Sequence, residues 1–321
     1  MLTFPSLVST VALFAALLIP GFIMGKCKRV QRSAVSTVAN ILSDVAMPAL
    51  VLVKLLEIDI KTLDPTSIVI CLALPSVVIM ALHFISKLAF ASKHEDRSDS
   101  AAKFCSVFSN CGFLGIPLAA ALFPDRPEAT VYVSLANLVS SFFLLTLGMN
   151  ILSDGCNCKK NGIVCIIFRP ITFAVIIGFV LSAFDVGSML PSLTSYFGTL
   201  SSLTTPLSMI VLGYELSQMK PKELFGDARI YAVGAIKLLV SPMIAFVLLA
   251  FLKFILKTEL SYTLKAAMLI TTAISTAASA PAMARANGIE GSLPASATIV
   301  NTLLCVITLP TLWTLFDAVL I

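Results

Sequence analysis

The sequence predicts an all-α membrane protein of ten transmembrane helices, built as two inverted five-helix repeats whose fourth and ninth helices are broken and cross. Composition is the first indication. The 321 residues are 58% hydrophobic and only 12% charged, with a mean hydropathy of +0.99, whereas about a quarter of the residues of a soluble domain are charged. This composition excludes a large catalytic domain outside the membrane and a nucleic-acid-binding module.

Hydropathy divides the chain into ten apolar segments, because a spanning helix needs ~20 apolar residues. The predicted spans are Phe4–Met24, Val35–Leu55, Thr66–Phe90, Ala101–Leu122, Ala129–Leu152, Ile163–Leu181, Ser195–Gln218, Ile230–Leu256, Leu264–Ala286 and Leu293–Leu320. Most Lys and Arg residues follow the odd-numbered spans, which predicts that both termini are non-cytoplasmic. We expect a multi-pass protein, and the cell membrane is favoured over an internal membrane as its location. The first span is expected to be a transmembrane helix rather than a signal peptide that is removed.

Matched residues in the two halves predict the repeat. Pro117 and Pro281 are 164 positions apart, and so are Asn137 and Asn301. Two further proline pairs relate span n to span n+5: Pro48 with Pro206, and Pro75 with Pro242. Because five spans is an odd number, the second repeat (residues 161–321) is inverted relative to the first (residues 1–160). Secondary transporters have this architecture.

The fourth and ninth spans contain the predicted breaks. In the fourth, Gly112, Gly115 and Pro117 interrupt an apolar helix, and in the ninth a run of small residues ends at Pro281. Proline removes a backbone donor, and glycine lowers the cost of unwinding. Each segment taken alone also suits simple helix packing. As a matched pair, they indicate a binding site at the membrane midplane.

Such a site favours an anion, because two converging half-helix N-termini present free N–H groups and positive dipole ends. A carboxylate would bind there without a buried Arg. The first-choice side-chain contacts are Asn110, Ser109, Ser275 and Thr276, with Asn137 and Asn301 facing them from the adjoining spans. The alternative for each amide is an interhelical hydrogen bond worth about 1 kcal/mol.

Charged and titratable residues inside spans are functional hypotheses by default, since an unpaired charge is costly there. Asp44 lies in the second span, His83 in the third, Glu215 in the seventh and Lys237 in the eighth. Lys237 would neutralise Asp44 or a bound carboxylate, and Asp44 or His83 would carry a coupling proton. The alternatives are snorkelling of Glu215 to the interface and a structural hydrogen bond for His83.

Several classes of site are not expected. Cys156 and Cys158 have C-x-C spacing without a second pair or a His cluster, which argues against a metal site. The chain has two His, no G-x-S-x-G and no P-loop, so neither an enzyme nor a cofactor is predicted. Nucleic acid is not an expected partner.

The sequence resembles the auxin efflux carrier family, which includes plant carriers and bacterial permeases for malate or malonate. The resemblance rests on Asn110-Cys-Gly-Phe-Leu-Gly-Ile-Pro117, Pro206-Leu-Ser-Met-Ile-Val-Leu-Gly213, Lys237-Leu-Leu-Val-Ser-Pro242 and the small-residue run ending at Pro281. It implies a scaffold and dimer surface from spans 1, 2, 6 and 7. It also implies a moving transport domain from spans 3–5 and 8–10, substrate at the crossover, and elevator-like motion. The long cytoplasmic loop of the large plant carriers is absent.

The predicted function is secondary transport of a small mono- or dicarboxylate by a homodimer in lipid, with a proton favoured over sodium for coupling. A sodium-coupled carrier of the bile-acid-symporter type is one alternative. It needs clustered polar and acidic ligands near the crossover, and neither broken segment contains an acidic residue. A non-transporting membrane sensor on the same fold is the other alternative, for which this chain lacks room for a signalling domain.

Overall fold

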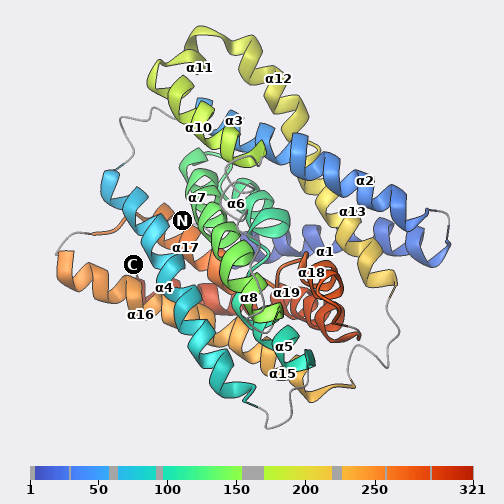
Figure 1. The fold of residues 1–321 in the computed structure, drawn as a ribbon. Helices are drawn as coiled ribbons and strands as arrows, with labels where there is room; N and C mark the ends of the chain where they lie inside the picture. Colours follow the sequence, from blue (N-terminus) through green and yellow to red (C-terminus); the bar gives the residue numbers. More distant parts are fainter. Residues whose placement is uncertain are drawn as a thin grey trace.

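The computed structural model describes residues 4–28, 30–57, 64–91, 97–153, 170–218, 226–256, 259–289 and 291–320. Within these ranges the regular structure is entirely helical, and the one β-type contact is an isolated bridge between two unwound segments (Figure 1). This confirms the prediction of an all-α protein. Cys156 and Cys158 lie outside the described residues.

The first half of the chain forms long helices that include π-helical turns. Its elements are α1 (Phe4–Lys26), α2 (Arg32–Ile41), η1 (Leu42–Ala46), α3 (Met47–Leu56), α4 (Pro65–Ala89), α5 (Arg97–Val107), η3 (Cys111–Gly115), α6 (Ile116–Leu122), α7 (Pro127–Phe143), η4 (Leu144–Gly148) and α8 (Met149–Leu152). The π-helical turns do not end the helices, so α2 to α3 and α7 to α8 are each continuous.

The second half contains several shorter helices and two long helical segments, 228–256 and Leu293–Leu320. Its elements are α10 (Pro170–Ala183), α11 (Val186–Met189), α12 (Pro191–Ser201), α13 (Thr204–Ser217), α15 (Ala228–Ala235), η5 (Ile236–Val240), α16 (Ser241–Leu256), α17 (Tyr262–Ala273), α18 (Ala280–Ala286) and α19 (Leu293–Leu320). The elements α15, η5 and α16 again form one continuous helix.

Prolines explain three of the π-helical turns. Pro48, Pro117 and Pro242 each lie two residues after the last residue of such a turn. In an α-helix the proline ring clashes with the carbonyl four residues earlier and leaves it without a donor. A π-helical turn pairs residues five apart and is wider, so the helix absorbs the proline and continues.

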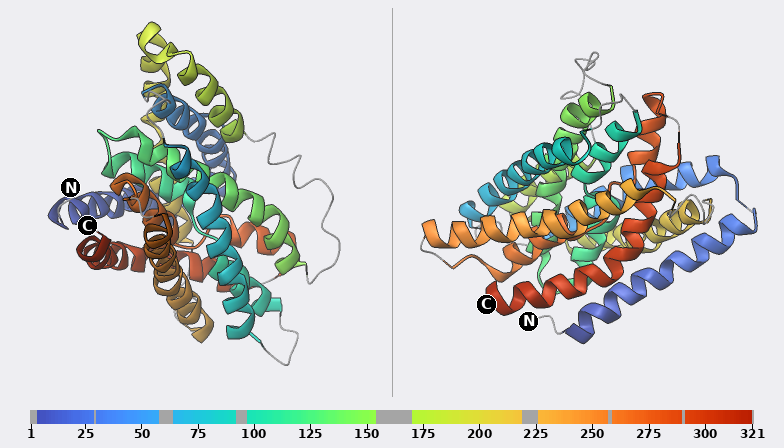
Figure 2. Two further views of the ribbon diagram at one scale, coloured as in Figure 1. Left: turned by 90° about the vertical axis from the view of Figure 1, so that its left-hand side faces the viewer. Right: turned by 90° about the horizontal axis from the view of Figure 1, so that it is seen from below.

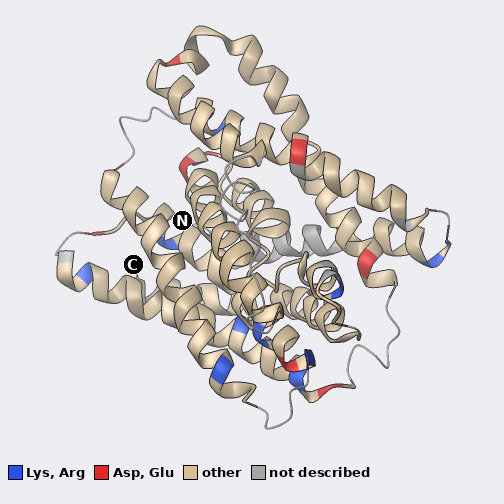
Figure 3. Cartoon of the chain, viewed as in Figure 1, with Lys and Arg blue, Asp and Glu red and all other residues tan. Residues whose placement is uncertain are grey.

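Five helices are long and apolar enough to cross a membrane, judged by length and composition: Ser33–Leu56, Pro65–Ala89, Pro127–Leu152, Ala228–Ile255 and Leu293–Phe316. The predicted fourth and ninth spans are interrupted, so neither provides one helix of that length. Charged residues concentrate near helix ends and connections (Figure 3), while large apolar side chains such as Leu88, Val247 and Phe254 are exposed along helix faces. These features fit an integral membrane protein.

Helices α1 and α13 pack closely because of their glycines. A side chain at Gly21 would collide with the backbone of Ile210, and one at Gly213 would collide with the backbone of Leu18. Gly25, one turn after Gly21, lies against Ser217. The spacing of Gly21 and Gly25 is the small-residue pattern that lets membrane helices approach closely.

The helices form two groups that are in contact. In the first group, α1 packs on α13, and α3 packs on α10 and α12. In the second group, α4 and α17 pack on α7, α16 packs on α17, and α5 and α15 pack on α19 (Figure 2). The largest buried cluster includes Phe104, Phe108, Leu264 and Met268. It lies mainly within the second group, around the two interrupted helices.

Candidate functional site

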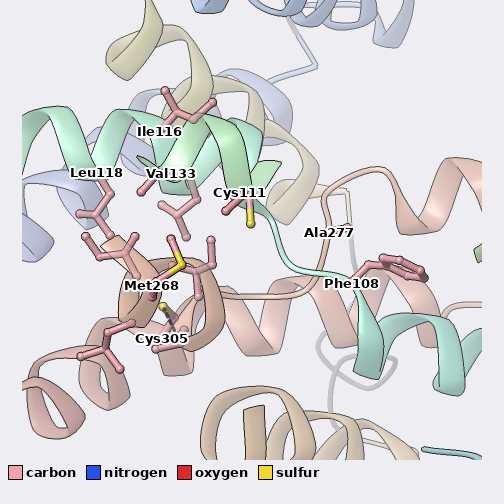
Figure 4. Packing of buried hydrophobic residues seen from close by; sticks show 14 of the residues in the cluster. Phe108, Cys111, Ile116, Leu118, Val133, Met268, Ala277 and Cys305 are labelled. Carbon is pink, nitrogen blue, oxygen red and sulfur yellow. Dashed lines mark hydrogen bonds between the residues drawn. The ribbon is translucent and has the colours of Figure 1, made fainter. Parts of the chain in front are cut away.

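The two interrupted helices meet at their unwound residues, 108–110 between α5 and η3 and 274–279 between α17 and α18. Ser109 and Thr276 form an antiparallel bridge. The Asn110 N–H donates to the Ser275 carbonyl at 2.8 Å, and the Ala277 N–H donates to the Phe108 carbonyl at 2.9 Å. Figure 4 shows the two segments passing beside each other near Phe108 and Ala277. We call this pair of segments the crossing.

The prolines do not mark the points of unwinding, which corrects the role given to Pro117. The chain unwinds after Val107, well before Pro117, and Pro117 is buried in the first turn of α6. Pro281 likewise lies in the first turn of α18. At Pro281 the proline is tolerated because the N–H it lacks has no helical partner, whereas Pro117 lies in the continuous helix of η3 and α6 and is accommodated by the π-helical turn. Gly115 serves close packing, since a Cβ at Gly115 would lie 3.1 Å from Ile274 Cδ1.

Side chains from the second half bond the end of α5. Thr276 Oγ1 donates to the Cys105 carbonyl at 3.0 Å and accepts from Asn301 Nδ2 at 2.9 Å. Lys237 Nζ donates to the Val107 carbonyl at 3.3 Å. The last carbonyls of a helix have no intrahelical donor, so these bonds fix the point where α5 ends. Thr276 and Asn301 thus hold the crossing together.

The crossing also contains buried polar atoms without a partner. Among the described residues, Asn110 Nδ2, Ser275 Oγ and Asn301 Oδ1 make no hydrogen bond. Asn110 is 3% exposed and Ser275 is fully buried. Leaving a buried polar group unpaired costs about 1–3 kcal/mol, so each atom has a hydrogen-bonding capacity that the described residues do not use. Asn110 Nδ2 and the Ser275 hydroxyl are donors, which suit a carboxylate oxygen.

A cavity of about 300 Å³ approaches the crossing from between the two helix groups. Its walls come from α1, α2 and α13 on one side and from α18 and α19 on the other. Phe113, one turn after Asn110, and Ser279, at the start of α18, also line it. A second cavity of about 420 Å³ shares Glu215, Pro281 and Arg285 with the first. Asn110 and Thr276 do not line either cavity.

The family profile described as membrane transport protein matches the chain twice, at residues 5–161 and 157–313. The chain belongs to this family. The match confirms the resemblance to the auxin efflux carriers, and it covers nearly the whole chain. The interrupted helices are therefore a feature of a membrane transport protein.

A curated relative of this membrane transport protein points to the same class. The chain is 24% identical over 315 residues to a protein of Methanothermobacter thermautotrophicus that is described as an uncharacterized transporter. The aligned region covers 95% of this chain and 96% of the relative. The likeness extends over both halves of the transport protein and both interrupted helices.

The structure separates the charged and titratable candidates. Asp44 is exposed on η1, which packs on α2, α3, α10, α12 and α13. Lys237 is buried on η5, which packs on α5, α15, α16, α17 and α19. The suggested pairing of Lys237 with Asp44 is therefore not formed. His83 is half-buried, and its Nδ1 has no hydrogen-bond partner in the described part of the chain.

The remaining predicted contacts lie around the crossing. Ser109 is half-buried, and Gly112 faces Asn137: a Cβ at Gly112 would lie 3.5 Å from Asn137 Oδ1. Glu215 is half-buried and lines both cavities. Sequence reasoning missed Phe113, Ser279 and Arg285 as cavity residues. The position of Arg285, four residues after Pro281 on α18, is the signal that would have placed it beside the same cavity.

Proposed function

We propose that this membrane transport protein is a secondary transporter of small organic anions, mono- or dicarboxylates, that works by elevator-type alternating access. Ten spans in two inverted repeats of five, residues 1–160 and 161–321, would form it. The single observation that carries the proposal is the crossing, where two interrupted helices pair through their backbones. Irregular backbone at membrane depth is tolerated where it is buried in protein or lines a cavity, and in transporters it binds substrate.

The chemistry of the crossing supports an anionic substrate. Asn110 Nδ2 and the Ser275 hydroxyl are buried and unpaired within the described residues, so both can donate to a carboxylate. The helix that starts at Cys111 adds N–H groups without intrahelical acceptors and a positive dipole end. Asn110 lies immediately before that start. In this proposal Asn110 is the central contact, with Ser109, Gly112 and Asn137 around it.

The cavity supports an alternating-access mechanism. It separates α1, α2 and α13, which belong to the proposed scaffold, from α18 and α19, which belong to the proposed transport domain. Movement of the second helix group against the first would close this cavity and open the other side. Asp44 and His83 are the proposed carriers of a coupling proton, and sodium is less favoured because neither unwound segment contains an acidic residue.

The proposed assembly is a homodimer in the cell membrane, with both termini non-cytoplasmic. Helices α11 and α12 have no buried residue, and Met189, Tyr196 and the intervening Leu190 are exposed. This apolar surface on the first helix group would be covered by a second copy and by lipid. Crosslinking in native membranes through single cysteines on α12 tests the dimer.

Substitution of Asn110 tests the substrate site. Protein in liposomes is assayed for uptake of labelled malonate, malate and indole-3-acetate, with Asn110→Ala compared against Asn150→Ala, a matched change at an exposed position on α8. Loss of one charge-assisted hydrogen bond of about 1.5–3 kcal/mol predicts a roughly tenfold to hundredfold higher KM in Asn110→Ala. Equal uptake by the two variants would remove Asn110 from the site. Uptake of no carboxylate by the wild type would refute the anion proposal.

A further inference from the structure

Lys237 is a positive charge buried at the crossing. It is 1% exposed and lies in the π-helical turn η5. Its Nζ donates to the carbonyl of Val107, the last residue of α5 before the chain unwinds. Among the described residues no carboxylate forms an ion pair with Lys237. A buried ammonium without a counter-ion costs free energy. A functional role would account for its presence at this position.

The ends of the two broken helices are bonded in different ways. At the end of α5 the donors are the Lys237 ammonium and the Thr276 hydroxyl. At the end of α17 the donors are two thiols: Cys111 Sγ to the Thr271 carbonyl at 3.7 Å, and Cys305 Sγ to the Ala273 carbonyl at 3.6 Å. Thiols are weak donors. An interrupted helix can therefore end here without an ammonium, and Lys237 is not a general requirement for ending one.

The C-terminal end of a half-helix attracts cations, since its carbonyls and dipole are negative, and in secondary transporters such ends coordinate sodium. We propose that Lys237 is a built-in cation that permanently occupies this end of α5. Sodium is then not needed there. This inference rests on the proposed function, because it assigns to Lys237 the charge that accompanies the carboxylate through the membrane.

The built-in charge has a measurable consequence for transport. The turn η5, which contains Lys237, packs on α5, α16, α17 and α19 in the second helix group, so the charge of Lys237 moves with the substrate in the proposed mechanism. A monocarboxylate and Lys237 together carry no net charge, and exchange of labelled for unlabelled monocarboxylate is expected to be independent of voltage. A dicarboxylate leaves one net negative charge. Lys237→Met makes each loaded form more negative by one charge.

The transport experiment measures exchange in liposomes under a potential imposed with potassium and valinomycin, using the carboxylate of the panel with the fastest uptake. Lys237→Met is expected to change the dependence of exchange on voltage by roughly threefold to tenfold, and Lys237→Arg is expected to leave it unchanged. The matched control is Lys253→Met on α16, where the Lys253 side chain is 40% exposed and its ammonium is paired with Glu259. An identical voltage dependence of Lys237→Met and wild type would overturn the proposal, as would a sodium requirement in the wild type.

A second measurement needs no substrate and so stands apart from the proposed function. The Tm of purified wild type is expected to be equal in sodium chloride and in N-methylglucamine chloride. In Lys237→Ala the side chain leaves a space at the end of α5, and propylammonium chloride is expected to raise the Tm of this variant above its value in choline chloride. A sodium-specific rise in the wild type, or no response of Lys237→Ala to propylammonium, would contradict a built-in cation. If Lys237→Ala does not fold, the wild-type comparison still decides.

Discussion

Thr276 is the residue whose replacement tests how the crossing is held together. Its hydroxyl donates to the Cys105 carbonyl and accepts from Asn301 Nδ2, and it is fully buried. Valine has nearly the same shape and lacks the hydroxyl, so Thr276→Val leaves both partners unpaired. Each buried unpaired group costs about 1–3 kcal/mol, whereas hydrogen bonds within membrane proteins average about 0.6 kcal/mol because other partners are found.

Between these limits we expect Thr276→Val to lower the free energy of unfolding by about 2 kcal/mol. Within the described residues, Thr276 is the one side-chain partner of Asn301 Nδ2, and Asn301 Oδ1 has no partner. No other hydrogen bond of this amide therefore compensates for the loss. The measurement is unfolding in mixed micelles, followed by the fluorescence of Trp313. That residue is the single tryptophan of the chain and is buried in α19, the helix that contains Asn301.

Thr272→Val is the matched control. The Thr272 hydroxyl donates to the Met268 carbonyl one turn earlier in α17, a carbonyl that the helix already pairs. Such a local bond contributes little, and we expect a loss below about 0.5 kcal/mol. Thr276→Ser keeps the hydroxyl and is expected to retain most of the stability. Equal losses in Thr276→Val and Thr272→Val would refute the assignment of Thr276 as the link between the two segments.

Further predictions concern glycines in close contacts and charged residues that line the cavities. Gly213→Ala places a Cβ against the Leu18 backbone and is expected to lower the Tm markedly, whereas Gly198→Ala, with open space around it, is expected to leave the Tm unchanged or higher. Gly115→Ala brings a Cβ within 3.1 Å of Ile274 Cδ1 and is expected to cost about 1–3 kcal/mol in the micelle unfolding assay. Arg285→Gln removes a cation that lines both cavities, so the KM for carboxylate uptake is expected to rise and to depend less on salt. Glu215→Gln removes an anion from the same cavities and is expected to lower the KM.

The interruptions could be predicted from the sequence because particular residue types accompany them. Paired prolines and runs of small residues mark the fourth and ninth segments, and the structure unwinds both. The exact point of unwinding could not be predicted, because it depends on contacts between the halves: Asn110 bonds to Ser275, and Lys237 bonds to Val107. Residues this far apart in the chain carry no local signal of their pairing.

The π-helical turns show the same limit at shorter range. Pro48, Pro117 and Pro242 suggest broken helices when only local rules are applied. The structure keeps each helix continuous by widening the preceding turn. Tertiary packing selects between a break and a wide turn, since the cost of a π-helical turn is offset by burial of the helix on its neighbours. The position of a proline in the sequence therefore does not show whether the helix unwinds there or continues through a wider turn.

The two halves use equivalent positions for different tasks. Asn137 and Asn301 are 164 positions apart, and so are Gly112 and Thr276. In the second half, Asn301 is fully buried, bonds to Thr276 and lies against Gly234. In the first half, the half-buried Asn137 faces Gly112, which has no hydroxyl to offer. Thr276 and Asn301 of the second half thus hold the crossing together. Gly112 and Asn137 of the first half make no such bond, so the Asn137 amide remains near Asn110. A substrate site built at the crossing would therefore be asymmetric, with its ligand groups mainly in the first half and its fixed bonds and its charge in the second.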